Sequence, residues 1–584
     1  MKPTISIAIS AWKGRLRSVV NHVRQWRIVR PFRVAIRYWR VRNGGLPDWP
    51  TLLGGSAVPP FPIIKSTSAQ PPGKRILIAT GTAGHLPSIT VESYLGMALR
   101  ERAADVEFLL CDKALPACMM CEINWYSDVA AFARSGPRDQ CGVCHDPSAD
   151  MLTAAGLRHI GLSSALTTAD LQEADNLATR FNEKEIRECR IDDVAVGEHA
   201  LAGALRFFAR GELPNVAVAD AVLRRYFKAA LLSLRACQSL FRSGRYDVVV
   251  LNHGIYVPQG VIAETARREG VRVVTWHPAY RRGCFIFNHH ETYHHGLMTE
   301  PVSAWEDMLW GEPQQQRIAD YLRSRWIGRE DWVRFHHDPI FDVTEIERDI
   351  GIDLSRPTVG LLTNVVWDAQ LHYPANAFVN MLDWLLKTIA YFAGRDDLQL
   401  LIRVHPAERS GTLPSLQPVL EEIRKAFPDL PKNVFIIPSE SRLSTYVAMS
   451  GCNAVIIYGT KTGVELTASG KPVIVAGESW IRGKGVTQDA NSEDEYFAFL
   501  NALPLPAGLA PAMQERAIKY AFHFFFRRMI PLKGFVQSAG WPPFKIAISG
   551  IDDLKPGACK GLDLVCAGIL NGSSFVYPAE DEVT

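Results

Sequence analysis

Short apolar runs recur along the chain, and most of them end in Gly, Asn, His, Pro or Thr. Examples are RILIATG (75–81), YDVVVLNHG (246–254) and LQLLIRVHP (398–406), and helical patterns lie between such runs. Short runs bounded by turn residues predict buried strands, and strands that alternate with helices indicate parallel sheets. Open α/β sheets bind ligands beyond the carboxyl ends of their strands, so the polar residues at these ends are candidate site residues.

The predicted strands form two sets, over roughly 75–300 and 355–480. Two such sets predict an α/β fold with two Rossmann-like domains that face each other across a cleft. A stretch rich in Pro, Gly and Ser precedes the first set, and a long helical pattern follows the second. The predicted units are a basic amphipathic arm (1–44), a Pro/Gly-rich linker (45–74), an N-terminal domain (75–335), a C-terminal domain (345–505), and a helix with a tail that packs back (506–584).

Positive charge is concentrated at the start of the chain. Residues 1–43 contain eleven Lys or Arg and no Asp or Glu, whereas the whole chain has a net charge of only +3. Between Arg24 and Arg40 the arginines recur every three or four residues, which places them on one helical face that Pro31 interrupts. A basic amphipathic helix is typical of an anionic membrane surface, with a protein partner as the alternative. No nucleic-acid module follows, so we expect no nucleic-acid partner.

The composition of the 584 residues, 47% hydrophobic and 21% charged, is that of an ordinary globular protein. No apolar run reaches the roughly 18 residues of a spanning helix, and the N-terminus lacks a secretory pattern. The sequence therefore predicts a cytoplasmic protein that lies peripherally on the inner membrane. In a reducing compartment its cysteines are expected to be thiols or metal ligands.

Two CxxC pairs, Cys118 with Cys121 and Cys141 with Cys144, are separated by nineteen residues. This spacing predicts a tetrahedral Zn²⁺ site, with an iron–sulfur cluster or buried free thiols as alternatives. Four cysteine ligands leave no open coordination position, so the predicted metal is structural.

Three strand ends carry candidate ligand-binding residues. In GTAGHLPSI (81–89), Gly84 allows a close backbone approach and His85 is expected to face the cleft. In LLIRVHPAERSG (400–411), Arg403 and His405 can donate to phosphate, and Glu408 can accept from a sugar hydroxyl. A third run, IIYGTKTGVELTASGKPVIVAG (456–477), is expected to cradle phosphate through its hydroxyls, lysine and helix amides, although its spacing is not that of a P-loop. Its candidate residues are Thr460, Lys461, Thr462, Gly463 and, for ribose, Glu465.

A carboxylate at another strand end is a candidate general base. Asp368 in NVVWDAQ (364–370) follows the first strand of the second set, where it can serve as a base or as a helix N-cap. His85 is the competing base, and the sequence leaves the choice between them open. Segments 252–260 and 275–290 are expected to line the acceptor side, although His277 within them is expected to be structural.

Several of these motifs resemble the bacterial capsule polysaccharide biosynthesis family over roughly 240–530. They are RVHPAE, YGTKTGVELTASGKPVIVAGESWIRGKGVTQD and KYAFHFFFRRM. That family comprises glycosyltransferase-like proteins of the GT-B fold and includes Kdo transferases of capsule export systems. GTAGH is similar, more weakly, to the glycine loop of other GT-B enzymes. The resemblance implies that the nucleotide phosphate and ribose contact Arg403, His405, Pro406, Glu408, Thr460, Thr462, Gly463 and Glu465, and that Arg482 in WIRGKG lies near the nucleotide.

The resemblance implies a glycosyltransferase that moves a sugar from a nucleotide-sugar donor to a surface or capsular glycan, free or lipid-linked. By analogy the donor is CMP-activated. Lys461 departs from the family pattern, in which hydroxyls are usual at this point. No catalytic metal is expected, because basic side chains can neutralise the leaving phosphate. The alternatives are a sugar-nucleotide 2-epimerase and a non-catalytic glycan-assembly subunit of the same fold.

Overall fold

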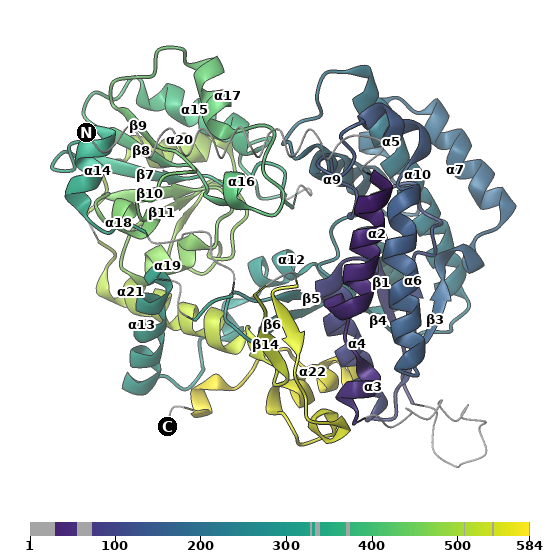
Figure 1. Cartoon of the computed structure of the whole chain (residues 1–584). Coiled ribbons are helices and arrows are strands. Elements are labelled where there is room, and N and C mark those ends of the chain that lie inside the picture. The colour runs from purple at the N-terminus through teal and green to yellow at the C-terminus, as the bar shows by residue number, and fades with distance from the viewer. Residues whose placement is uncertain are drawn as a thin grey trace, which may run out of the picture.

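The computed structural model of the chain (Figure 1) describes residues 30–54, 73–327, 330–332, 339–369, 374–506, 508–539 and 542–582. Two α/β domains lie side by side, and the C-terminal segment runs beneath both. The two predicted Rossmann-like α/β domains are confirmed. The predicted linker lies largely outside the described residues.

The N-terminal domain is built on a seven-stranded sheet in the order β13-β6-β5-β4-β1-β2-β3. Strands β1 to β5 are parallel, whereas β6 and β13 are antiparallel additions at one edge. The strand order reverses between β1 and β4, and in such sheets a crevice opens at this switch point. The bounds are β1 Arg75–Gly81, β2 Asp105–Leu110, β3 Arg158–Gly161, β4 Val248–Asn252, β5 Arg272–Pro278, β6 Cys284–His289 and β13 Ile530–Pro531.

Helices cover both faces of this sheet. The 26-residue α10 is the longest of the described helices, and its apolar face packs against α7, α9 and α11. The helices are α4 Leu86–Arg100, α5 Val129–Ser135, α6 Arg138–Ala154, α7 Thr168–Arg180, α8 Glu183–Glu188, α9 Val196–Phe208, α10 Ala217–Arg242, α11 Gln259–Arg268 and α12 Tyr293–Met298. The next helix, α13 (Glu312–Ile327), lies under the C-terminal domain in Figure 1 and packs on α21 (Pro511–Phe522).

The C-terminal domain has a six-stranded parallel sheet in the order β12-β11-β10-β7-β8-β9, with its switch point between β7 and β10. Its strands are β7 Thr358–Leu362, β8 Gln399–Arg403, β9 Val434–Ile437, β10 Ala454–Ile457, β11 Val473–Val475 and β12 Gln488–Asp489. Its helices are α14 Val343–Ile350, α15 Met381–Phe392, α16 Ala407–Ser410, α17 Val419–Ala426, α18 Thr445–Ser450, α19 Thr462–Ala468 and α20 Glu493–Asn501.

The C-terminal segment joins the two domains. Helix α21 (Pro511–Phe522) packs on α19, β13 then pairs with β6, and α22 (Lys560–Asn571) packs on α4 and β4. A two-stranded sheet of β14 (Phe535–Gln537) and β15 (Phe544–Ile546) lies between them. Buried aromatics of this segment, such as Tyr520 and Phe524, extend one hydrophobic core from the first sheet to the second. Burial of this apolar surface holds the segment against both domains.

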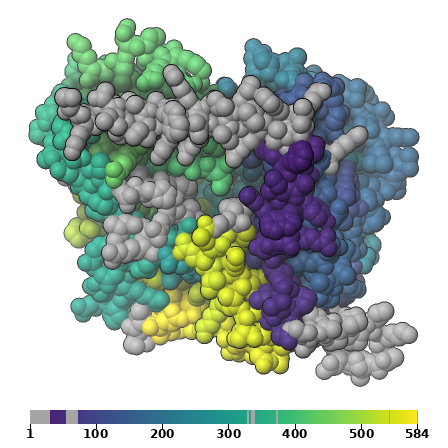
Figure 2. All heavy atoms as spheres, viewed as in Figure 1, coloured from purple at the N-terminus to yellow at the C-terminus, as the bar shows by residue number. Residues whose placement is uncertain are grey.

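The described part of the arm, α2 (Arg30–Arg40), packs along α6 (Figure 1) and is exposed on its other side, as Figure 2 shows in purple. Arg30, Arg33 and Arg37 face the protein body, whereas Arg40 is exposed. Arg30 pairs with Asp139, and the guanidinium groups of Arg33 and Arg37 lie 4.5 and 4.8 Å from the centroid of the Trp125 ring. A short π-helix (Val41–Gly45) follows α2. Residues 1–29 of the predicted arm lie outside the described residues.

The outward side of α2 is apolar. Phe32, Ile36 and Trp39 are 68%, 53% and 65% exposed, and their spacing places them on one helical face. A short helix α3 (Trp49–Leu52) follows, with Trp49 buried. None of the helices in the described ranges is long and apolar enough to cross a membrane.

Candidate active site

A cavity of about 570 Å³ lies between the two domains. Residues of α12 and the β5–β6 turn form its N-terminal-domain side, and loops after β7, β8 and β10 form its C-terminal-domain side. The cavity therefore lies at the C-terminal domain's switch point, where the sheet order places a ligand. Of the predicted residues, it brings together Asp368, Arg403, His405, Pro406, Thr460, Lys461 and Thr462.

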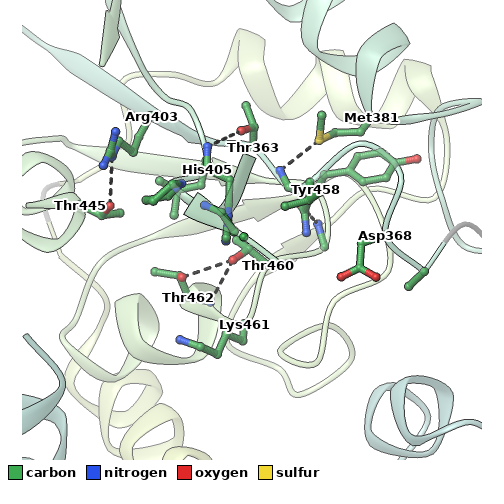
Figure 3. Close-up of a pocket in the computed structure, with 18 of the residues that line it drawn as sticks. Thr363, Asp368, Met381, Arg403, His405, Thr445, Tyr458, Thr460, Lys461 and Thr462 are labelled. Atoms are coloured by element: carbon green, nitrogen blue, oxygen red, sulfur yellow. Dashed lines mark hydrogen bonds between the residues drawn. The ribbon is translucent and has the colours of Figure 1, made fainter. Parts of the chain in front are cut away.

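His405 follows the end of β8 and is held by two backbone contacts. Its own N–H donates to Thr363 Oγ1 over 3.0 Å, and the Ala407 N–H donates to its Nδ1 over 3.1 Å. Because Nδ1 accepts, the neutral ring carries its proton on Nε2. His405 thus presents a donor to the cavity, beside Thr460, while Asp368 is set apart from them (Figure 3). An N–H donor of this kind suits a phosphate oxygen.

Arg403 lines the cavity, but its guanidinium group donates hydrogen bonds to other groups of the protein. It is 1% exposed, and its guanidinium donates to Thr445 Oγ1 at 3.2 Å, to Ser441 O at 3.1 Å and to Pro438 O. Burial lowers the pKa of Arg403 to about 10. In this geometry the side chain ties the loop after β9 to β8, and its predicted contact with phosphate stays a prediction.

Glu408 is also engaged within its own domain. It is 2% exposed, its Oε2 accepts the Val419 N–H at 2.8 Å, and burial raises its pKa. It is not among the residues that line the cavity. Its predicted contact with a sugar hydroxyl stays a prediction.

The loop after β10 brings hydroxyls and a cation into the cavity. Thr460 Oγ1 and Thr462 Oγ1 are 3.3 Å apart, and both line the cavity with Lys461. Gly463 packs closely behind them, because a Cβ there would lie 2.6 Å from Ile457 Cδ1 and 2.9 Å from Ile481 Cγ2. The glycine is thus required by packing between loop and sheet.

Lys461 belongs to a buried ion network that the sequence did not predict. Its Nζ lies 2.6 Å from Glu465 Oε1, and the same oxygen accepts from Arg325 Nε at 3.0 Å. Arg325, on α13, also pairs with Asp331. Burial would raise the pKa of Glu465, but the charges of Arg325 and Lys461 lower it to about 2. Glu465 therefore acts here as the anion that holds both cations, and its predicted role toward ribose stays a prediction.

Arg482 organises the loop that follows β11. It donates to Gly477 O at 3.2 Å, Ala490 O at 2.9 Å and Asn491 Oδ1 at 2.8 Å. It does not line the cavity, whereas Trp480 in the same motif does. The motif thus contributes an aromatic wall, and Arg482 fixes the backbone behind it.

Asp368 makes a contact between the two domains. Tyr256 Oη, from the loop after β4, donates to Asp368 Oδ1 at 3.0 Å and accepts the Ala369 N–H at 3.0 Å. Tyr256 is only 6% exposed. The carboxylate is therefore oriented by a residue of the opposite domain, which the sequence gave no means to pair with it.

His85 occupies the N-cap position of α4 and is not among the residues that line the cavity. Its Nδ1 is 2.7 Å from Ser88 Oγ. Burial, and then the positive charges of Arg206 and His277, lower its pKa to about 3. His85 is thus neutral at physiological pH, and its assignment as the base stays a prediction.

Gly84 contacts the cysteine cluster rather than the cavity. Its N–H donates to Cys144 Sγ at 2.9 Å, and a Cβ on Gly84 would lie 3.0 Å from both Cβ and Sγ of Cys144. The glycine loop after β1 is therefore anchored on α6, which carries Cys141 and Cys144.

The four predicted metal ligands are only partly assembled. Cys118 Sγ and Cys121 Sγ are 4.0 Å apart, close to the spacing of two ligands on one tetrahedral ion. Within the described ranges, however, no three His, Cys, Asp or Glu side chains are arranged to hold a metal ion. Burial, followed by neighbouring thiols, raises the pKa of Cys141 to about 12, as expected for a neutral thiol. The zinc site stays a prediction.

No curated protein sequence matches the chain. Among solved structures, the KpsC β-Kdo 2,4-transferase of Thermosulfurimonas dismutans is 12% identical over 47% of this chain and 79% of that chain, with a TM-score of 0.31. The β-Kdo 2,7-transferase of the same organism is 14% identical over 55% and 88%, with a TM-score of 0.28. The UDP-GlcNAc 2-epimerase of Neisseria meningitidis is 10% identical over 77% and 95%, with a TM-score of 0.22.

The second half of the chain provides the sequence match. Residues 355–522 match the family described as capsule polysaccharide biosynthesis protein. This range contains the His405 loop, the Thr460–Thr462 loop and the Trp480 motif. The resemblance predicted from these motifs is thereby confirmed: over residues 355–522 the chain is similar to capsule polysaccharide biosynthesis proteins.

Proposed function

We propose that the protein is a GT-B glycosyltransferase that transfers a sugar from a nucleotide-sugar donor to a surface or capsular glycan. The observation that carries this proposal is the cavity between the domains, in which His405, Thr460, Lys461 and Thr462 meet at the carboxyl edge of a parallel sheet. Donors from a lysine, two hydroxyls and an imidazole N–H suit a nucleotide phosphate. The family match over 355–522 agrees with this activity.

In the proposed reaction, the bond between the sugar's anomeric carbon and the phosphate oxygen breaks, and the electron pair stays on the phosphate. Lys461 and the Nε2–H of His405 stabilise this negative charge, in a cavity where electrostatic interactions are stronger than in water. The acceptor hydroxyl forms the new bond to the sugar and gives its proton to a base. Asp368 and His85 are the candidates from the sequence. Charge neutralisation by these side chains requires no divalent metal, and a CMP-activated donor is the expectation from the family.

Release of free nucleotide from a panel of CMP-, UDP- and GDP-sugars tests the proposal. We expect release from one nucleotide class, with at least a tenfold loss in His405→Ala because one charge-assisted hydrogen bond disappears. Arg409→Ala, an exposed change on the neighbouring α16, serves as the control. Conversion of a UDP-sugar to its C2 epimer without nucleotide release would instead identify an epimerase. Absence of any turnover in folded protein would favour a glycan-assembly subunit.

We further propose that α2 places the protein on the inner membrane, through its apolar face rather than its arginines. Arg30, Arg33 and Arg37 contact Trp125, Tyr126 and Asp139. Phe32, Ile36 and Trp39 face outward. Exposed aromatic and aliphatic side chains on one helical face are typical of interfacial binding.

Sedimentation with vesicles containing phosphatidylglycerol tests this orientation. The triple change of Phe32, Ile36 and Trp39 to Ser is expected to reduce binding at least tenfold. A matched change of Val216 and Leu309 to Ser, which are 54% and 55% exposed elsewhere, is expected to leave binding unchanged. Equal binding of both variants would contradict the proposal.

The four cysteines are proposed to hold a structural zinc ion, with an iron–sulfur cluster as the alternative. The separation of Cys118 and Cys121 supports one ligand pair, and the other pair lies on α6. Metal analysis of protein purified without added metal tests this. One zinc per chain, lost together with thermal stability in Cys121→Ser, is the expected result, and a metal-free protein of normal stability would refute it.

A further inference from the structure

Histidines gather at the switch point of the N-terminal domain, outside the nucleotide cavity. His85 follows β1, His253 follows β4, and His277 lies near the end of β5. His253 and His277 are neighbours on adjacent strands, because Asn252 pairs with Trp276 and the His253 N–H donates to Trp276 O at 2.9 Å. Positive charge on His277 or His85 would also lower the pKa of His253 beyond the effect of burial. The carboxyl ends of β1 and β4 are where this sheet would hold a ligand.

The backbone fixes the tautomer of His253. The Ile255 N–H donates to His253 Nδ1 at 3.0 Å, so Nδ1 has no proton and the neutral ring carries its proton on Nε2. The side chain is 6% exposed, and within the described residues Nε2 has no hydrogen-bond partner. The residue also has a φ of +38°, which is rare outside glycine. A buried donor without a partner costs roughly 1–3 kcal/mol, which a bound oxygen would offset.

The backbone fixes the opposite tautomer in His277. Its Nδ1 lies 2.8 Å from Pro278 O, and because a carbonyl can only accept, Nδ1 carries the proton. Nε2 then bears a lone pair. The ring is partly exposed and stacks on Tyr293 with centroids 4.3 Å apart, and Tyr293 lines the cavity.

His277 and His85, the two histidines that are candidates for the base, have different charged neighbours. Burial lowers the pKa of His277, so its ring is neutral at physiological pH, while the negative charge of Asp368 acts in the opposite direction. Asp368 would therefore stabilise the imidazolium formed when His277 takes a proton. His85 has Arg206 as its charged neighbour and occupies the N-terminal end of α4, and both disfavour an imidazolium.

We propose that His277 and His253 bind the acceptor sugar as a pair, with His277 as the base and His253 as the positioning donor. Over the whole transfer, the acceptor oxygen bonds to the anomeric carbon, the bond from that carbon to the phosphate oxygen breaks, and the proton moves to His277 Nε2. The Nε2–H of His253 donates to a second oxygen of the same acceptor. The ligand class is a sugar terminus with two neighbouring oxygens. This inference rests on the proposed glycosyltransferase activity.

Substitutions that preserve one ring nitrogen at a time test the pair. His277→Asn keeps a donor for Pro278 O but removes the base, and should slow donor hydrolysis by water about 10²–10⁴-fold. Azide is an anion that needs no base, so it should restore turnover of His277→Asn and leave the parent rate unchanged.

His253→Asn keeps an acceptor for the Ile255 N–H but loses the donor at Nε2, whereas His253→Gln retains a donor there. His253→Asn should lose at least tenfold in the rate of donor hydrolysis, and His253→Gln should retain most of the parent rate.

Free CMP, UDP and GDP should shift the melting temperature of all variants as they shift that of the parent, because neither histidine contacts the nucleotide. Full activity of His277→Asn, or no response to azide, would overturn the base assignment. A parent that turns over no donor would contradict the proposed function instead. Imidazole ¹⁵N spectra, assigned with the same variants, read the tautomers without any turnover. A proton on Nε2 of His277, or on Nδ1 of His253, would overturn the inference by itself.

Discussion

The two switch points use the same local device for different chemistry. In the C-terminal domain, His405 Nδ1 accepts the N–H of Ala407, and in the N-terminal domain His253 Nδ1 accepts the N–H of Ile255. Both rings therefore hold a proton on Nε2 just beyond a central strand. His405 is accompanied by Lys461 and two threonine hydroxyls, whereas His253 is accompanied chiefly by the imidazoles of His277 and His85, with Arg206 as the nearby cation. One switch point suits an anion, and the other suits hydroxyl groups.

Two buried carboxylates, Glu465 and Glu92, differ in charge. Glu465 is held by Arg325 and Lys461 and stays ionised. Glu92, on α4, is fully buried, and its Oε1 accepts the Trp276 N–H at 3.0 Å, but burial raises its pKa to about 7. Glu465 is therefore ionised beside two cations, whereas Glu92 accepts hydrogen bonds from neutral groups and stays close to neutral.

Removal of the central cation should give the largest effect. Arg325→Leu leaves Glu465 and Asp331 buried without it, so we expect a loss of about 3–5 kcal/mol in the free energy of unfolding. Urea denaturation measures this. Arg323→Leu on the exposed side of the same helix should change it by less than about 0.5 kcal/mol. Similar losses in both variants would contradict the role of the network.

Glu92→Gln should raise the free energy of unfolding rather than lower it, and by an amount that depends on pH. The folded pKa of Glu92, about 7, lies above its ordinary value, so its contribution to stability is complete below pH 4.5 and is lost as the pH rises through 7. A glutamine does not ionise, and the variant should be more stable than the parent by about 3 kcal/mol at pH 8. Below pH 4.5 the two should denature alike. A constant difference at every pH would show that ionisation is not the cause.

Lys461→Met tests the anion site directly. The loss of one charge-assisted donor to phosphate should weaken nucleotide binding by about 10–100-fold, measured by calorimetry. Lys387→Met serves as the control, because Lys387 pairs with Asp383 and Glu493 away from the cavity. If both variants lost the same nucleotide affinity, the net positive charge of the protein, rather than the loop with Lys461, would account for nucleotide binding.

Tyr256→Phe should give the smallest effect. It removes the hydrogen bonds to Asp368 and Ala369 but preserves packing, so the loss should be about 1 kcal/mol in the coupling between domains. We expect kcat to fall several-fold while the affinity for free nucleotide stays constant. If only the affinity for nucleotide changed, Tyr256 would act on nucleotide binding in the C-terminal domain, and the predicted role in orienting Asp368 would be wrong.

Local patterns predicted much of the architecture. Apolar runs such as 75–81 and 398–406 became β1 and β8 because burial on both faces of a parallel sheet demands continuous apolar sequence. The loops with His405 and Thr460 to Thr462 were found because strand ends and ligand sites coincide. Arg325, Tyr256 and the tautomers of His253 and His277 were not found, because their meaning depends on partners distant in the sequence or on hydrogen-bond direction.

The arm shows the same division. Its sequence determined an amphipathic helix with arginines at helical spacing, a local property of the chain. Only the tertiary structure decided that Arg30, Arg33 and Arg37 face Tyr126, Trp125 and Asp139, so that the apolar side faces outward. The sequence by itself likewise determined two sheets of mainly parallel strands with polar strand ends. Which of those ends share the cavity, and which carboxylates are paired, followed from packing between segments that periodicity does not relate.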